Sequence, residues 1–137
     1  MRKGLIRQKT LQFSLILIIG ILLTACSRIQ PITNYNQQTV PNGLTLKEVK
    51  RAIIKGAEKR KWVIKEINDN QLQATYTSST HVAVVDIRYS TKAYSLTYAS
   101  SKNLDYDANM IHYNYNRWVR NLNKDIQTQL MQIPTYQ

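Results

Sequence analysis

The sequence predicts an α+β domain, a two-layer sandwich in which a four-stranded antiparallel meander carries an N-terminal and a C-terminal helix packed on one face. Three observations support this prediction. A helix-capping sequence opens an amphipathic stretch at Thr45, four short runs between residues 62 and 99 alternate in polarity, and a second helical stripe starts at Ile111. Both helices must cover the same side of the sheet if all apolar faces are to be buried, which gives the order α-β-β-β-β-α.

The first 25 residues have the composition of a signal peptide. Four basic residues and no acidic residue occupy positions 1–9, and positions 11–25 are apolar apart from Gln12, Ser14 and Thr24. This run is shorter than the ~18 to 20 apolar residues of a membrane-spanning helix and fits the ~7 to 15 of a signal peptide. We therefore expect export and removal of residues 1–25.

The only cysteine, Cys26, directly follows this run. The stretch Leu23-Thr24-Ala25-Cys26 resembles the lipobox of bacterial lipoproteins, in which small residues precede the cysteine that accepts the lipid. The resemblance implies that diacylglycerol is attached to the Cys26 sulfur, that the chain is cut before it, and that the new amine is usually acylated; two or more acyl chains hold a protein stably at a bilayer. Ser27, in place of an Asp, favours the periplasmic face of the outer membrane, with the outer face of a Gram-positive membrane as the alternative.

Residues 26–43 are predicted to be the lipidated cysteine and a flexible tether. They are mostly Gln, Asn, Thr, Pro and Ile, without periodicity, and contain Pro31 and Pro41. Residues 44–130 then form one small domain, and residues 131–137 a tail. After the signal peptide, fifteen Lys and Arg stand against eight Asp and Glu, a net charge of +7. This favours anionic partners such as lipid phosphates or acidic polymers, whereas nucleic acid is not expected for an exported protein.

The first helix is predicted to start at the capping box Thr45-Leu46-Lys47-Glu48 and to run to about Arg60. Its apolar face comprises Leu46, Val49, Ile53, Ile54 and Ala57. The opposite face carries Lys47, Arg51, Lys55 and Lys59, with Lys50 beside them, and is either a solvated face or an anion-binding face. Lys61 follows the helix at a position where glycine would supply a left-handed turn at lower cost.

Four strands are predicted at residues 62–67, 72–77, 81–89 and 93–99, separated by polar turn sequences. In the second and fourth runs apolar or aromatic residues alternate with Gln, Thr and Ser, so one face of the sheet is buried and the other is wet. The third run is apolar on both faces, which is typical of an interior strand.

The second helix is predicted from Ile111 to about Leu130, and the segment 101–122 is unusually dense in Tyr, Asn and charged residues. From the third strand onward the chain resembles an uncharacterised family of small proteobacterial lipoproteins with the pattern S-x-N-L-x-Y followed by I-H-x-x-Y-N-x-W-V-x-N-L. The matching residues are Ser101, Asn103, Leu104, Tyr106, Ile111, His112, Tyr115, Asn116, Trp118, Val119, Asn121 and Leu122. The family has no assigned activity, so the resemblance implies the anchor and the fold but no function.

Segment 101–122 has two interpretations, core or binding surface. Tyr106, His112, Tyr113 and Arg117 are its candidate surface residues. The many tyrosines either form a core with polar edges, in which each buried hydroxyl needs a partner, or line a groove in which sugars stack.

No catalytic or metal-binding motif is present. His81 and His112 are the only histidines, and Asp105 and Asp107 form an acidic pair in a loop; a small hydrolase or metal enzyme built on them is the less favoured alternative, because two histidines without spaced carboxylates make a weak metal site. We expect no catalytic residue, metal or cofactor. The sequence predicts a non-enzymatic envelope lipoprotein whose partner is another envelope protein or an anionic envelope polymer.

Overall fold

The chain folds into a five-stranded antiparallel sheet, a separate two-stranded sheet and two helices. The structure is a computed structural model and describes residues 28–135; the predicted signal peptide and Cys26 lie outside this range. Its elements are β1 (Ile29–Pro31), β2 (Tyr35–Thr39), α2 (Leu46–Glu58), β3 (Val63–Asn68), β4 (Gln71–Ser78), β5 (His81–Tyr89), β6 (Ala93–Lys102), β7 (Met110–His112) and α3 (Tyr113–Met131).

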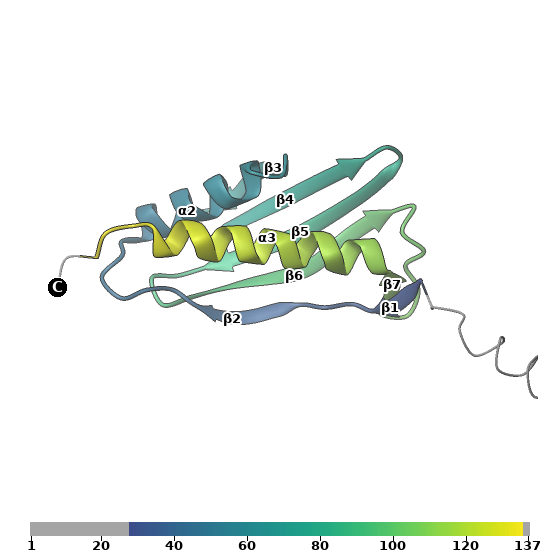
Figure 1. Ribbon diagram of the computed structural model, residues 1–137, viewed down its shortest axis with the longest axis horizontal. Coiled ribbons are helices and arrows are strands. Elements are labelled where there is room, and N and C mark those ends of the chain that lie inside the picture. Colours follow the sequence, from purple (N-terminus) through teal and green to yellow (C-terminus); the bar gives the residue numbers. More distant parts are fainter. Residues whose placement is uncertain (1–27, 136–137) are drawn as a thin grey trace, which may run out of the picture.

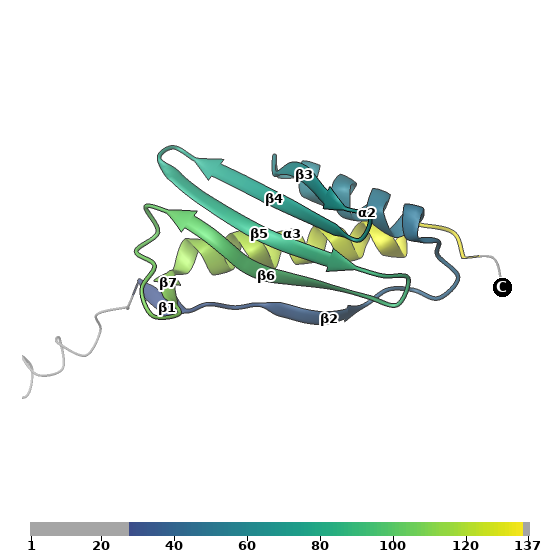
Figure 2. The ribbon, with the colours of Figure 1, turned by 180° about the vertical axis from the view of Figure 1, so that it is seen from behind.

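The large sheet has the strand order β2-β6-β5-β4-β3. Its last four strands are the predicted meander, and β5, the run that is apolar on both faces, has neighbours on both sides, as expected for an interior strand. Both helices lie on one face of the sheet and leave the other face uncovered (Figures 1 and 2). The α+β class and the shared helix face are therefore as predicted.

The predicted flexible tether is wrong for residues 28–43. β1 pairs with β7, and β2 pairs with β6 from Tyr35 opposite Leu96 to Thr39 opposite Ala93, so the sheet has five strands rather than four. Val40, at the end of β2, is only 2% exposed. The segment is polar because β2 is an edge strand with mostly exposed side chains, held by backbone hydrogen bonds that composition does not reveal.

Helix α2 begins as predicted and ends in a left-handed turn. The Glu48 backbone N–H donates to Thr45 Oγ1 at 3.3 Å, and the Thr45 N–H donates to the Glu48 carboxylate at 2.8 Å, which confirms the capping box. At the other end, Lys61 has φ 66°, and the N–H groups of Lys61 and Trp62 donate to the carbonyls of Glu58 and Ala57. These two hydrogen bonds form a Schellman motif, which turns Trp62 into the core although no glycine is present.

Helix α3 starts two residues later than predicted. Ile111 belongs to β7, because Met110–His112 pair with β1. His112 is the N-cap of the helix, and its ring Nδ1 accepts a hydrogen bond from the Asn114 N–H at 3.2 Å. Within the helix the residues predicted for the apolar stripe are buried except Trp118, which is half-buried; the buried ones are Tyr115, Val119, Leu122, Ile126 and Leu130.

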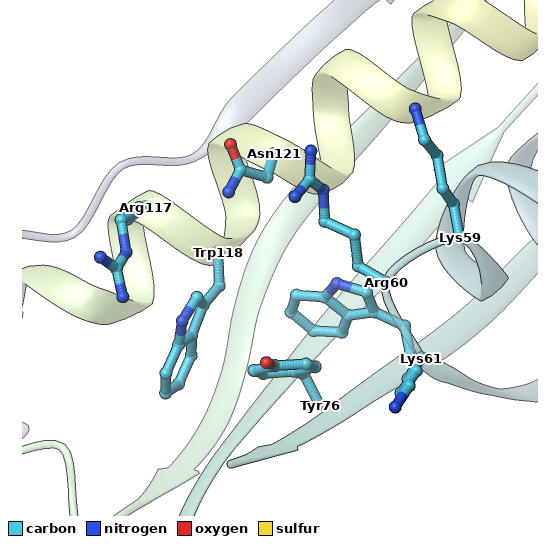
Figure 3. A pocket seen from close by; sticks show the side chains of 8 residues that line it. Lys59, Arg60, Lys61, Tyr76, Arg117, Trp118 and Asn121 are labelled. Carbon is cyan, nitrogen blue, oxygen red and sulfur yellow. The ribbon is translucent and has the colours of Figure 1, made fainter.

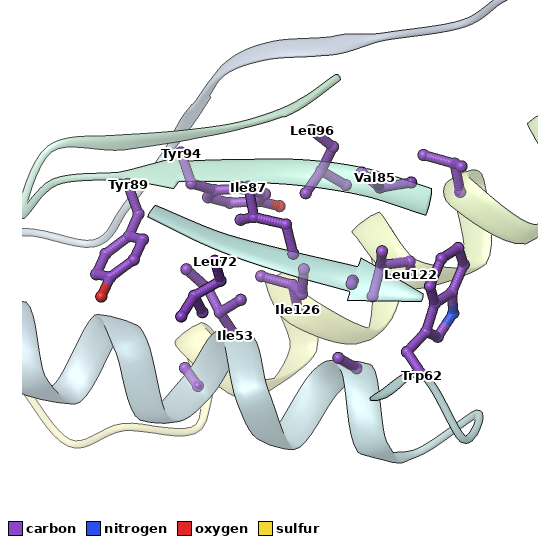
Figure 4. Packing of buried hydrophobic residues seen from close by; sticks show 14 of the residues in the cluster. Ile53, Trp62, Leu72, Val85, Ile87, Tyr89, Tyr94, Leu96, Leu122 and Ile126 are labelled. Carbon is purple, nitrogen blue, oxygen red and sulfur yellow. The ribbon is translucent and has the colours of Figure 1, made fainter. Parts of the chain in front are cut away.

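The core lies between the two helices and the covered face of the sheet (Figure 4). Ile53 from α2, Leu72, Ile87 and Leu96 from the sheet, and Leu122 and Ile126 from α3 are fully buried. Burying one such side chain stabilises a fold by about 1.5 to 3 kcal/mol. Two tyrosines at the edge of the core find hydroxyl partners: Tyr94 donates to Asn123 Oδ1 at 2.6 Å, and Tyr89 donates to the Asp69 carbonyl at 2.8 Å. These two belong to a core with polar edges.

Replacing Tyr115 with phenylalanine is expected to stabilise the domain by about 1 kcal/mol, because a buried hydroxyl without a partner costs free energy. Tyr115 is fully buried, burial raises the pKa of its phenol well above the usual value, and its hydroxyl has no hydrogen-bond partner among the described residues. Thermal denaturation of the purified protein measures the effect. Tyr94→Phe is the matched control and should destabilise by about 1 kcal/mol because it removes a satisfied bond. Equal shifts of the same sign would contradict this account.

Candidate ligand-binding site

An open pocket of about 500 Å³ lies between the end of α2, strand β4 and helix α3. We call it the aromatic–cationic pocket. Its lining residues are Lys59, Arg60, Lys61, Trp62, Tyr76, Arg117, Trp118 and Asn121. Figure 3 shows Arg117, Trp118 and Asn121 of α3 on one side and the end of α2, with Lys59, Arg60 and Lys61, on the other.

Three aromatic rings form one wall of this pocket. Tyr76 lies between Trp62 and Trp118, with ring centroids 5.3 Å from Trp62 and 4.9 Å from Trp118. Trp62 is buried, whereas Tyr76 and Trp118 are half-buried and reach solvent. These are the only two tryptophans of the chain. The wall therefore consists of one buried ring, Trp62, and two rings that are partly accessible to a ligand, Tyr76 and Trp118.

A buried carboxylate fixes two of the four cations on the rim. Asp125 of α3 has a side chain that is 5% exposed, and its oxygens accept from Lys59 Nζ at 3.0 Å and from Arg60 Nε at 2.7 Å. Burial by itself raises the pKa of the Asp125 carboxyl, but the hydrogen bonds from Arg60 and Lys59 outweigh it and hold the pKa below its ordinary value. The carboxylate thus remains charged near neutral pH.

The other two cations of the rim, Lys61 and Arg117, are not paired with a carboxylate in the part of the chain that the structure describes. Neither Lys61 nor Arg117 forms a salt bridge within residues 28–135, and the Arg117 guanidinium lies 5.9 Å from the centre of the Tyr113 ring. Four basic side chains against one carboxylate give the pocket rim a positive charge. An anionic group entering it would find Lys61 and Arg117 available without breaking an ion pair.

The net positive charge of the domain lies in its helical layer, residues 46–61 and 113–131. These segments hold ten Lys and Arg against three Asp and Glu, a net charge of +7. The rest of residues 28–135 holds five of each and is neutral. A field with one sign over one face attracts anions toward that face, and the pocket opens between its two helices.

The four residues predicted to bind anions on α2 do not line one common cavity. Lys59 reaches the aromatic–cationic pocket, whereas Arg51 and Lys55 line a separate cavity of about 220 Å³ beside the end of α3, and Lys47 is exposed near the start of α2. Lys50, on the same helix, pairs with Glu66 of β3 at 2.7 Å.

The predicted surface residues also separate into two places. Arg117 lines the pocket, while Tyr106, His112 and Tyr113 lie at the end of the domain formed by β1 and β7. Tyr106 stacks on Tyr98 with a centroid distance of 4.7 Å, and His112 lies against Tyr113. Segment 101–122 thus contributes to both the core and the surface: Leu104 and Tyr115 are buried, whereas Tyr106 and Tyr113 are exposed.

The two histidines considered for catalysis make local contacts with the backbone, and the two aspartates considered with them are exposed. His81 lies at the β4–β5 turn, where its Nδ1 is 3.2 Å from the Ser78 carbonyl oxygen, and His112 caps α3. Asp105 and Asp107 are exposed in the loop before β7. In residues 28–135 no group of three or more His, Cys, Asp or Glu side chains is arranged to hold a metal ion.

Sequence reasoning missed Arg60, Lys61, Trp62, Tyr76 and Asn121 as members of one site. They come from the turn after α2, from β4 and from α3, and only the fold brings them together. One signal was visible in the sequence: Trp62 directly follows three basic residues at the end of a helix.

Comparison with known proteins gave no relatives: no family model, no curated protein and no solved structure matches the chain. Across residues 28–135, neither helix combines the length and the apolar character needed to cross a bilayer.

Proposed function

We propose that the protein is a non-enzymatic envelope lipoprotein, held at the membrane through acylated Cys26, that binds an anionic envelope ligand at the aromatic–cationic pocket. The observation that carries this proposal is the segregation of charge, since the entire net charge of +7 lies on the helical layer in which the pocket opens. Charge of one sign concentrated around a concave site favours ligands of the opposite sign.

The chemistry of the pocket narrows the ligand class. Partly open Trp and Tyr rings offer flat apolar surfaces for a sugar or another ring, and Lys61 and Arg117 offer donors for an anionic group. A ring next to a negative charge occurs in peptidoglycan fragments, as a carboxylate, and in glycolipid headgroups, as a phosphate. Both share the chemistry that this pocket would recognise.

The N-terminal sequence supports the proposed position in the cell. The lipobox-like Leu23-Thr24-Ala25-Cys26 and the following Ser27 support attachment at the periplasmic face of the outer membrane. Two or more acyl chains on the mature N-terminus would make this attachment stable.

Binding is tested by charge reversal in the pocket. The double variant Lys61→Glu/Arg117→Glu is expected to bind muropeptides or phosphorylated glycolipid at least about tenfold more weakly, which corresponds to ~1.4 kcal/mol. Tryptophan fluorescence of the detergent-solubilised lipoprotein is a direct readout, because both tryptophans line the pocket. Wild-type binding should also weaken as salt is raised.

The matched control is Lys92→Glu/Lys102→Glu, which makes the same change in net charge outside the helical layer. It should bind within about twofold of wild type, because exposed charges more than ~10 Å from a ligand are largely screened at 0.1 M salt. Equal losses in both double variants would show a diffuse charge effect and would remove the pocket from the proposal. Wild-type protein that binds neither ligand class would leave another envelope protein as the partner to seek.

The anchor is tested by Cys26→Ala. The variant is expected to leave the membrane fraction, because the acyl chains that hold the protein have no attachment site. Fractionation of cells with immunoblotting measures this, and intact mass of the native protein measures the lipid directly. A native protein with an unmodified Cys26 sulfur and with Met1 still attached would refute the anchor.

A further inference from the structure

We propose that the end of the domain formed by β1, β7 and the loop 103–109 rests on the bilayer surface, with Tyr106, Met110 and Tyr113 at the lipid interface. This inference rests on the proposed acylation of Cys26. It assigns a partner, the lipid surface, to residues of segment 101–122 that do not line the aromatic–cationic pocket.

The chain between the anchor and the fold is very short. Only Ser27 and Arg28 separate Cys26 from Ile29, the first residue of β1. Three residue steps span at most about 11 Å. The polar layer on each side of a bilayer is about 5 to 8 Å thick. An acylated Cys26 would therefore hold β1 at the headgroups or directly above them.

β1 is fixed to the rest of the domain and cannot act as a spacer. The Tyr113 N–H donates to the Arg28 carbonyl at 2.8 Å, and the Ile32 N–H donates to the Asn109 carbonyl at 2.9 Å. Asn116, a buried side chain of α3, accepts from the Thr33 N–H and donates to the Pro31 carbonyl, both at 2.9 Å. The anchored end and the loop 103–109 thus move as one body.

This end exposes a cluster of apolar and aromatic side chains. Tyr106 is 50% exposed, Met110 36% and Tyr113 39%, all within eight consecutive residues. The other exposed large apolar side chains of residues 28–135 are Leu46, Val63, Ile67 and Met131, which lie on α2, on β3 and at the end of α3. Figure 1 shows β1 and β7 together at one end of the long axis, with the start of α2 and the end of α3 at the other.

The apolar and aromatic residues of this cluster fit a lipid interface better than a protein partner bound through charged groups. Tyrosine is enriched where a bilayer meets water, because its ring is apolar and its hydroxyl is polar. Around this cluster Arg28, Lys102 and Arg117 stand against Asp105 and Asp107, so the local net charge is only +1. Contact with lipid at this end should therefore depend little on salt, unlike binding at the aromatic–cationic pocket.

Single cysteines test the contact in the native lipoprotein. Because acylation turns the Cys26 sulfur into a thioether, an introduced cysteine is the only free thiol of the mature chain. Tyr106→Cys and Met110→Cys, labelled with an environment-sensitive fluorophore and reconstituted in phosphatidylcholine vesicles, should be quenched by acrylamide several-fold less than labels at Leu46→Cys and Met131→Cys. Acrylamide is uncharged, so the positive helical layer around the two control positions does not concentrate it. The control positions are exposed and lie at the far end of the domain.

The outcomes separate this inference from the anchor itself. Lipid found on Cys26 by intact mass, together with equal quenching at all four positions, would overturn the membrane contact and leave the anchor standing. A mature protein without lipid would overturn both. Protection at Tyr106→Cys and Met110→Cys that persists at high salt would support the contact as described.

Discussion

Gly56→Ala is expected to destabilise the domain by about 2 kcal/mol, because overpacking a tight contact costs roughly 1 to 3 kcal/mol. Gly56 is buried in α2 where the helix touches α3. A Cβ added there would lie 2.7 Å from both the Cα and the N of Ile126, and 3.0 Å from the Asp125 carbonyl carbon. All three atoms belong to the backbone, so the two helices must move apart to accept the methyl group. Urea denaturation measures the loss.

The direction of the stability change caused by Gly56→Ala decides whether the two helices are in close contact. At an unconstrained helical position, glycine to alanine stabilises by about 1 kcal/mol through helix propensity alone. Glu58→Ala, at an exposed position on the same helix, is the control and should change stability by less than about 0.5 kcal/mol. A gain in stability for Gly56→Ala would show that the helices do not approach as closely as described.

Asp125→Ala is expected to destabilise the domain by about 1.5 to 3 kcal/mol, the range for hydrogen bonds to charged groups. The loss stays below that of a fully buried ion pair, because Lys59 and Arg60 are about half exposed and can be hydrated once the carboxylate is gone. The same variant should bind the proposed anionic ligand more tightly, since it removes the carboxylate that pairs with Lys59 and Arg60 on the pocket rim. Opposite changes in stability and affinity distinguish this role from a simple loss of folding.

The stability difference between wild type and Asp125→Ala should depend on pH. The pKa of the folded Asp125 carboxyl lies below the ordinary value of about 3.9 that applies to the unfolded chain. Its contribution is therefore fully present above that value and is lost as the pH falls through the lower, folded pKa. The denaturation midpoints of wild type and Asp125→Ala should differ at pH 7. They should begin to approach each other as the pH falls below about 4. A constant difference over this range would contradict the ion pair.

The sequence predicted the elements with strong local signals. The capping box predicted the start of α2 correctly. The side chains of Thr45 and Glu48 each accept a hydrogen bond from the other residue's backbone N–H, and this arrangement needs no contact with the rest of the fold. The alternation of β4 and β6 and the apolar β5 gave the meander and its interior strand. Lys61 was identified as the place for a left-handed turn, and its φ of 66° shows that the turn forms without glycine.

The missed features depend on contacts between distant residues. β2 has few apolar side chains, and what stabilises it is pairing with β6, nearly 60 residues away, which no local pattern reports. The pocket was missed for the same reason: Lys59 and Arg117 were each recognised, but only the packing of α2 against α3 places them on one rim. Ile111 was assigned to the helix because its apolar character fits both a helical stripe and a strand.

Helix α3 has a mechanical consequence for a protein fixed at one end. Asn116 binds the backbone around β1, and the next two residues, Arg117 and Trp118, line the pocket. If Cys26 is acylated, a pulling force between the bilayer and a ligand in the pocket would have a short path through the β1–β7 pairing and a single turn of this helix. Because Tyr76 of β4 also lines the pocket, the remainder of the load would be carried by the five-stranded sheet.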